Sequence, residues 1–247
     1  MHYIETRSIL SPKNGMNLYR GCQHGCIYCD SRSRCYHMDH RFEDVAVKQN
    51  AIELLELALK RKRRPCMIGT GSMSDPYTPI EEELQMTLTT MDEGLCRLIE
   101  PGVCTTQKRI EVLKECQKRG IPTVVWLCPI LPWLNDTPEN IRGIVESCAE
   151  AGVTGIVHFG MGVTLRDGSR EHYYTQLDRK FPGIKERTIR TYGSAYELRS
   201  AHHRELSDLF HALCAKYGIW HDNNQIFHWL SRLEEPEQLR FWEQEAI

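Results

Sequence analysis

Strand-like and helix-like segments alternate along this 247-residue chain, and this alternation most constrains its fold. Short apolar stretches at residues 66–70, 85–90, 123–127 and 153–159 are separated by longer segments with helical periodicity. Two parallel strands need a crossover of a dozen or more residues, usually a helix, so this order is typical of parallel sheets covered by helices. The sequence therefore predicts an α/β fold.

The signals at the ends of the segments place the helices. Thr137 is a plausible N-cap with Pro138 at the first helical position, and Gly152 follows the last one. Together with a first strand at residues 16–20, the pattern predicts helices at residues 45–63, 108–119, 138–151 and 201–217. One domain over residues 1–247 is expected, with residues 1–14 and 234–247 as peripheral tails.

Three cysteines follow the first predicted strand. Cys22, Cys26 and Cys29 have CxxxCxxC spacing, which lets one short loop direct three thiolates to one point. Three soft anionic ligands suit an iron–sulfur cluster in which one iron has no protein ligand. The alternative is a structural zinc site with Cys35 as the fourth thiolate, although zinc sites usually contain two CxxC pairs.

A second motif, residues 69–77, begins where another predicted strand ends. It reads Gly-Thr-Gly-Ser-Met-Ser-Asp-Pro-Tyr, and its two glycines allow the backbone to approach a ligand closely. By itself such a segment is more often only a turn. Beside the cysteine loop it indicates a cofactor contact.

The cysteine loop, with Tyr28 before its third cysteine, resembles the signature of the radical S-adenosylmethionine superfamily. The similarity to its spore photoproduct lyase-like branch covers about residues 10–225 and includes residues 100–106, 109–114, 120–122 and 129–132. It implies a partial βα barrel in which Cys22, Cys26 and Cys29 bind a 4Fe-4S cluster. It also implies that Tyr28 lies against the adenine of S-adenosylmethionine.

The resemblance assigns further cofactor contacts and a reaction. The expected S-adenosylmethionine contacts in the second motif are Gly69, Thr70, Gly71, Ser72 and Asp75. The cluster would reductively cleave S-adenosylmethionine to a 5′-deoxyadenosyl radical that abstracts hydrogen from a substrate. An external electron donor such as flavodoxin or ferredoxin is implied. The substrate and the catalytic residues stay unassigned, with nucleic-acid repair or modification one option.

The chain departs from this branch at residues 78–85, where related chains insert a helix, a strand and a further helix. Only residues 71–84 are available for a parallel crossover, and they include Pro76 and Pro79. Either two formerly separated strands become neighbours or a gap opens in the sheet. The alternative function is therefore a catalytically weak or inactive iron–sulfur binding or redox protein.

Charge and cysteine usage set further limits. The formal net charge of −2 gives no global reason to expect nucleic acid, and the basic residues 60–64 fit a solvated helix end. Eleven cysteines without the spacing of a disulfide scaffold fit the reducing cytoplasm. The sequence shows no secretion signal and no apolar stretch long enough to span a membrane, so neither location is expected.

Several other residues have two interpretations. His158 either faces the barrel lumen or is a satisfied core histidine. The radical hydrogen donor could be among Cys35, Cys104 and Cys128, but free cysteines are usually small buried hydrophobes. Residues 221–224, His-Asp-Asn-Asn, resemble a metal cluster but are more simply helix caps.

Overall fold

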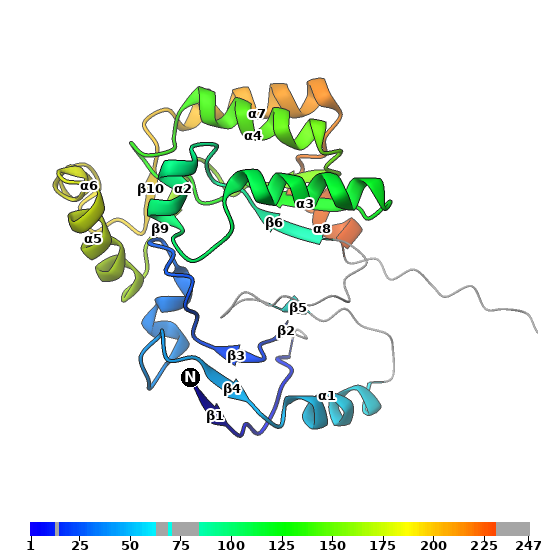
Figure 1. Ribbon diagram of the computed structural model, residues 1–247. Coiled ribbons are helices and arrows are strands. Elements are labelled where there is room, and N and C mark those ends of the chain that lie inside the picture. Colours follow the sequence, from blue (N-terminus) through cyan, green and yellow to red (C-terminus); the bar gives the residue numbers. More distant parts are fainter. Residues whose placement is uncertain (13–14, 63–68, 71–83, 231–247) are drawn as a thin grey trace, which may run out of the picture.

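The computed structural model describes residues 1–12, 15–62, 69–70 and 84–230 (Figure 1). Its central sheet is parallel, in the order β6 (Leu84–Thr87), β7 (Thr123–Trp126) and β8 (Gly155–Val157). Helices α2 (Glu93–Ile99) and α3 (Thr106–Lys118) connect β6 to β7, and α4 (Pro138–Glu150) connects β7 to β8. The predicted α/β class is confirmed.

Helix α4 shows why local signals succeed. The Thr137 side chain accepts a hydrogen bond from the Asn140 N–H at 3.2 Å, as expected of an N-cap. Ile141, Ile144 and Cys148 then lie on one buried face, spaced by three and four residues. This face packs toward the sheet and toward α7 (His203–Tyr217), which lies beside α4 in Figure 1.

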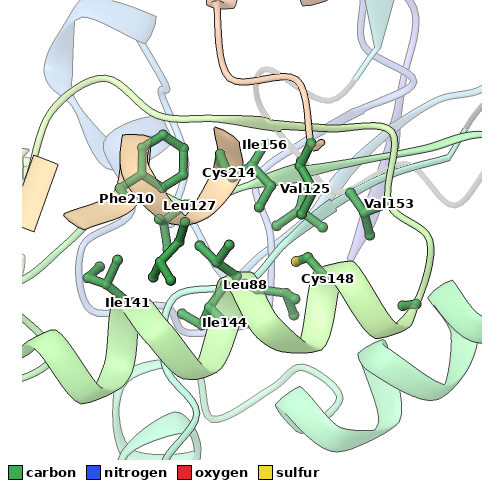
Figure 2. Packing of buried hydrophobic residues seen from close by; sticks show 14 of the residues in the cluster. Leu88, Val125, Leu127, Ile141, Ile144, Cys148, Val153, Ile156, Phe210 and Cys214 are labelled. Atoms are coloured by element: carbon green, nitrogen blue, oxygen red, sulfur yellow. The ribbon is translucent and has the colours of Figure 1, made fainter. Parts of the chain in front are cut away.

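The main hydrophobic core lies between the central sheet and these helices (Figure 2). Val125 and Ile156 come from the strands, Ile144 from α4 and Phe210 from α7, and all four side chains are fully buried. Burial of each such side chain contributes about 1.5–3 kcal/mol before the entropy cost of folding is subtracted. This part of the molecule thus has a core of its own.

The N-terminal part contains two smaller sheets. Strand β4 (Ala46–Lys48) pairs in parallel with β1 (His2–Ile4) and antiparallel with β3 (Tyr19–Arg20). Strand β2 (Gly15–Met16) pairs in parallel with β5 (Gly69–Thr70). Helix α1 (Ala51–Lys60) follows β4. The predicted N-terminal tail therefore contributes the strand β1.

The C-terminal third is more regular than predicted. Strands β9 (Gly162–Thr164) and β10 (Glu197–Arg199) form an antiparallel pair. Helices α5 (Ser169–Lys180) and α6 (Ile184–Tyr192) lie between them in the sequence, where an irregular stretch was predicted. Helix α8 (Asn223–Leu230) packs its Ile226 and Leu230 against Val124 and Val157 of the central sheet.

Two boundaries near the cysteine loop differ from prediction. The strand predicted at residues 16–20 is split into β2 and β3, which join different sheets. The helix predicted at residues 45–63 begins only at Ala51, because residues 46–48 pair with β1 and β3 as strand β4. Backbone pairing with distant strands overrides the local helical pattern here.

The structure shows parallel strand pairs of the kind that a partial barrel contains, but these pairs form separate sheets. Within the described residues, no ladder joins β5 to β6, so β2–β5 and β6–β7–β8 are distinct sheets. Most of the shortened segment, residues 78–83, lies outside the described residues, as does the predicted tail at residues 234–247. No helix in the described ranges is long and apolar enough to cross a membrane.

Candidate cluster-binding site

Two glycines shape the cysteine loop. Gly21 has φ +96°, and a side chain there would collide with the carbonyl oxygen of Phe42. The next residue, Cys22, donates its backbone N–H to that same oxygen at 3.0 Å. Gly25 has φ +72°, which also favours glycine. The backbone can therefore turn tightly just before Cys22 and again just before Cys26.

The loop is anchored to the end of α2. Fully buried Ile27 donates its backbone N–H to the Ile99 carbonyl at 3.0 Å, and Gly102 donates to the His24 carbonyl at 2.8 Å. A Cβ atom on Gly102 would lie 2.5 Å from that His24 oxygen, so this approach requires glycine. The cysteine loop and residues 99–102 form one packed unit although they lie far apart in the sequence.

The three predicted ligands lie on this loop, close enough for the charges of Cys22 and Cys29 to act on Cys26. Cys22, Cys26 and Cys29 are all partly buried and free. Burial raises the pKa of Cys26 to about 12, and the charges of Glu100 and of the other two cysteines add to this shift. Burial also raises the pKa of Cys29. A metal binds the thiolate form of cysteine and releases the thiol proton. The positive charge of iron would therefore compensate the negative charge that burial disfavours. The donor set fits a cluster.

The structural zinc alternative requires Cys35 as its fourth thiolate. Cys35 is exposed, and its sulfur lies 3.6 Å from Nη1 of Arg166. Within the described residues, no group of three or more His, Cys, Asp or Glu side chains is arranged to hold a single metal ion. A cluster makes a different demand, because each thiolate binds a different iron and the sulfurs stand farther apart.

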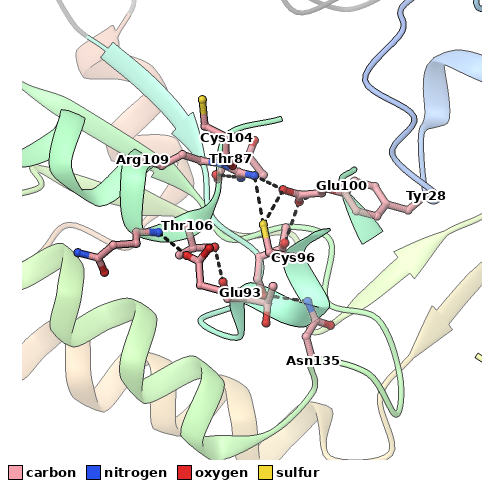
Figure 3. A network of polar contacts seen from close by, with 12 residues as sticks. Tyr28, Thr87, Glu93, Cys96, Glu100, Cys104, Thr106, Arg109 and Asn135 are labelled. Atoms are coloured by element: carbon pink, nitrogen blue, oxygen red, sulfur yellow. Dashed lines mark hydrogen bonds and ion pairs between the residues drawn. The ribbon is translucent and has the colours of Figure 1, made fainter. Parts of the chain in front are cut away.

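Tyr28 belongs to a buried polar network that sequence reasoning missed (Figure 3). Its hydroxyl donates to the Glu100 carboxylate, which also receives hydrogen bonds from Thr89 and Arg109. Burial and the Glu100 charge raise the pKa of Tyr28 well above its ordinary value. Although burial opposes it, the Glu100 charge raises the pKa of Arg109. The only available signal was a Glu before Pro-Gly with an Arg nine residues later.

The second predicted motif is described only in part. Gly69 and Thr70 form β5, where Thr70 pairs with Met16 a few residues before the cysteine loop. Gly71, Ser72 and Asp75 lie outside the described residues. The first two residues of this motif therefore pair with the strand β2 that precedes the cysteine loop, and the remaining contacts stay predictions.

His158 is a core histidine of the helix layer. Its ring packs edge-on against buried Phe210 of α7, with centroids 4.4 Å apart. Its Nδ1 accepts the Gly160 backbone N–H at 3.2 Å. Burial, with contributions from His211, His203 and His221, lowers its pKa to about 4. These contacts favour the interpretation of His158 as a satisfied core histidine over one in which it faces the barrel lumen.

The remaining sequence candidates are dispersed. Cys104 is exposed and lines a surface pocket beside α3, while burial raises the pKa of Cys128 to about 11. Neither shows a thiol placed for a defined reaction.

Residues 221–224 lie at the start of α8. Asp222 accepts the Gln225 backbone N–H at 2.8 Å, and Asn223 donates to the His158 carbonyl at 2.7 Å. The capping interpretation is thus confirmed for Asp222.

The fold is shared with solved structures of a lyase. Several solved structures of spore photoproduct lyase are similar to this chain. A mutant of that enzyme has TM-score 0.61 and 11% identity, covering 89% of this chain and 80% of its own. A complex with dinucleoside spore photoproduct has TM-score 0.57 and 12% identity, covering 83% and 74%. The predicted resemblance is confirmed for the fold.

Sequence comparisons add relatives without a named activity. An uncharacterized protein of Mycobacterium tuberculosis is 26% identical over 258 residues, covering 84% of this chain and 75% of the relative. An uncharacterized protein of Methanocaldococcus jannaschii is 28% identical over 182 residues, covering 57% and 68%. No family model matches the chain.

Proposed function

We propose that this protein is a radical S-adenosylmethionine enzyme whose Cys22, Cys26 and Cys29 hold a 4Fe-4S cluster. The proposal is supported by the CxxxCxxC loop with its three free cysteines and by the fold that the chain shares with spore photoproduct lyase. One solved structure of that lyase contains bound AdoMet, which is S-adenosylmethionine. With both groups bound, the site supplies reductive carbon–sulfur cleavage and a radical that abstracts hydrogen from substrate.

The chain's own residues bind and shield these groups. The three cysteines ligate iron, and the Ile27–Ile99 and Gly102–His24 hydrogen bonds keep their loop against α2. Tyr28 lies between the second and third ligands, where the resemblance places an adenine contact. Gly69, Thr70, Gly71, Ser72 and Asp75 are the other proposed cofactor contacts. No catalytic side chain is assigned.

A second candidate follows from the shortened segment at residues 78–85. Because the sequence leaves only residues 71–84 for a parallel crossover, we propose as the alternative a protein that keeps a cluster without turnover. This alternative is an iron–sulfur binding or redox protein. It predicts iron uptake without any 5′-deoxyadenosine, whereas the enzyme predicts both.

Anaerobic reconstitution distinguishes the two functions. Wild-type protein should take up about four irons per chain, and with S-adenosylmethionine and dithionite it should form 5′-deoxyadenosine. Cys22→Ala, Cys26→Ala and Cys29→Ala should each lose the cluster. The matched controls Cys35→Ala and Cys104→Ala change exposed thiols and should keep it. Iron uptake without 5′-deoxyadenosine would leave the redox alternative, and zinc in place of iron would reject both.

Partners and location follow from this chemistry. The enzyme needs an external one-electron donor, such as flavodoxin or ferredoxin, and a reducing compartment, for which we propose the cytoplasm. All cysteines in the described part of the chain are free, which is compatible with such a compartment. A nucleic-acid substrate is one proposal, because two of the related lyase structures contain a dinucleoside spore photoproduct.

A further inference from the structure

We infer that Glu100 and Arg109 are positioning residues that set the orientation of Tyr28 at the cofactor site. This inference rests on the proposed function, since it concerns how the loop between Cys26 and Cys29 receives S-adenosylmethionine. In the part of the chain that the structure describes, neither residue is hydrogen-bonded to Cys22, Cys26 or Cys29. Both act through the phenol of Tyr28, which Figure 3 shows directed at Glu100.

The Glu100 carboxylate is enclosed by donors. Its side chain is only 2% exposed, and one of its oxygens accepts the hydroxyl hydrogens of both Tyr28 and Thr89. The other oxygen accepts from Nη2 of Arg109. A buried carboxylate with every partner in place holds one geometry, because leaving any lone pair unmet costs free energy.

Arg109 ties this carboxylate to the central sheet. Its Nη1 donates to the Thr87 carbonyl at 2.7 Å, at the carboxyl end of β6, and its Nε donates to the Cys104 carbonyl at 2.8 Å. The guanidinium therefore bridges α3, the strand end and Glu100. A guanidinium is planar and rigid, so hydrogen bonds on several of its nitrogens fix its position and that of the carboxylate bound to it. The chain of contacts runs from β6 through Arg109 and Glu100 to Tyr28.

This chain of contacts gives the Tyr28 ring a fixed orientation. The ring lies in the small stretch between two ligands, and its hydroxyl is held by a group on another element. Aromatic contacts with a planar ligand depend on ring orientation, so a ring free to rotate would bind less tightly. The backbone bonds of Ile27 and Gly102 hold the cysteines themselves independently of the Glu100 side chain. Removal of the phenol bond should thus weaken S-adenosylmethionine binding without loss of iron.

The test compares Tyr28→Phe, Glu100→Gln and their double variant in reconstituted protein. Matched controls are Tyr36→Phe, which loses a hydroxyl bonded to Asp30 nearby, and Glu43→Gln, which loses an exposed pairing with Arg32. The measurements are iron content, the electron paramagnetic resonance spectrum of the reduced cluster, and the dissociation constant for S-adenosylmethionine. Because Glu100→Gln leaves Arg109 buried without its anion, Glu100→Gln/Arg109→Met provides a version with neither charge.

We expect each single variant to raise the dissociation constant about tenfold, with the double variant no worse than either single one. Iron content should match wild type, and the spectral change caused by S-adenosylmethionine should be altered. Provided that wild type binds S-adenosylmethionine, an unchanged dissociation constant in Tyr28→Phe would overturn the positioning role. Weaker binding that appears only in proportion to lost iron would overturn it as well. If wild type itself neither holds iron nor binds S-adenosylmethionine, the proposed function fails as well.

Discussion

His158 should make the folded protein less stable as the pH falls from 7 to 5. Its imidazole packs on Phe210 and accepts the Gly160 N–H through Nδ1, so the neutral form fits this site. Burial, followed by the charges of His211, His203 and His221, lowers its pKa from 6.5 to about 4. In the unfolded chain the imidazole takes up a proton at higher pH. The unfolded state therefore binds more protons between these values.

The sign and size follow from this difference. A lowered histidine pKa does not reduce the stability of the fold at pH values above the pKa of the unfolded chain. The loss of stability grows as the pH falls toward the pKa of the folded protein, about 4. At pH 5 the full effect would be about 2 kcal/mol, because one pKa unit corresponds to about 1.4 kcal/mol. His158 is only partly buried, so solvent screening reduces our expectation to about 1 kcal/mol.

Urea unfolding of cluster-free protein, followed by tryptophan fluorescence at both pH values, measures this effect. His158→Asn keeps a hydrogen-bond acceptor near Gly160 but does not titrate. The loss of unfolding free energy between pH 7 and 5 should be about 1 kcal/mol smaller in this variant than in wild type. The control His37→Asn changes an exposed residue with φ 47°, a conformation that asparagine tolerates. Equal losses in wild type and His158→Asn would refute the reasoning.

Two further predictions concern stability. Arg109→Met should cost about 3–5 kcal/mol of unfolding free energy because it leaves Glu100 buried without its cation, and Arg109→Met/Glu100→Gln should recover much of this loss. Additive losses in urea unfolding of the double variant would contradict the coupling. Ile144→Ala should cost about 2–5 kcal/mol through the cavity it leaves in the main core, with exposed Ile189→Ala as the control. A cost equal to that of the control would mean that the Ile144 site collapses freely.

Local signals explain most of what the sequence predicted correctly. Helix α4 begins and ends near its predicted limits because Thr137, Pro138 and Gly152 act within a few residues. The strand β7 was recognisable from its continuous apolar run, as expected for a strand buried on both faces. The cysteine triad was visible for the same reason, since its spacing is contained in one loop.

The missed features depend on distant contacts or weak patterns. Helix α5 is strongly polar and buries few large side chains, among them Tyr173 and Leu177, so its periodicity is faint. Its start was marked only by the Gly168 N–H, which donates to the Glu171 carboxylate at 2.6 Å. The bond from Tyr28 to Glu100 spans 72 residues, and no spacing rule connects them. Such partners become visible only when the fold brings α2 against the cysteine loop.

The cysteine loop has a support that does not depend on the segment between β5 and β6. Backbone hydrogen bonds hold the loop against residues 99–102 at the end of α2. That end of α2 is joined through the Glu100–Arg109 pair to β6 and α3, which belong to the independently packed main core. The support of the three proposed iron ligands therefore comes from elements outside the shortened crossover. This separation is why iron uptake and 5′-deoxyadenosine formation must be measured as independent properties.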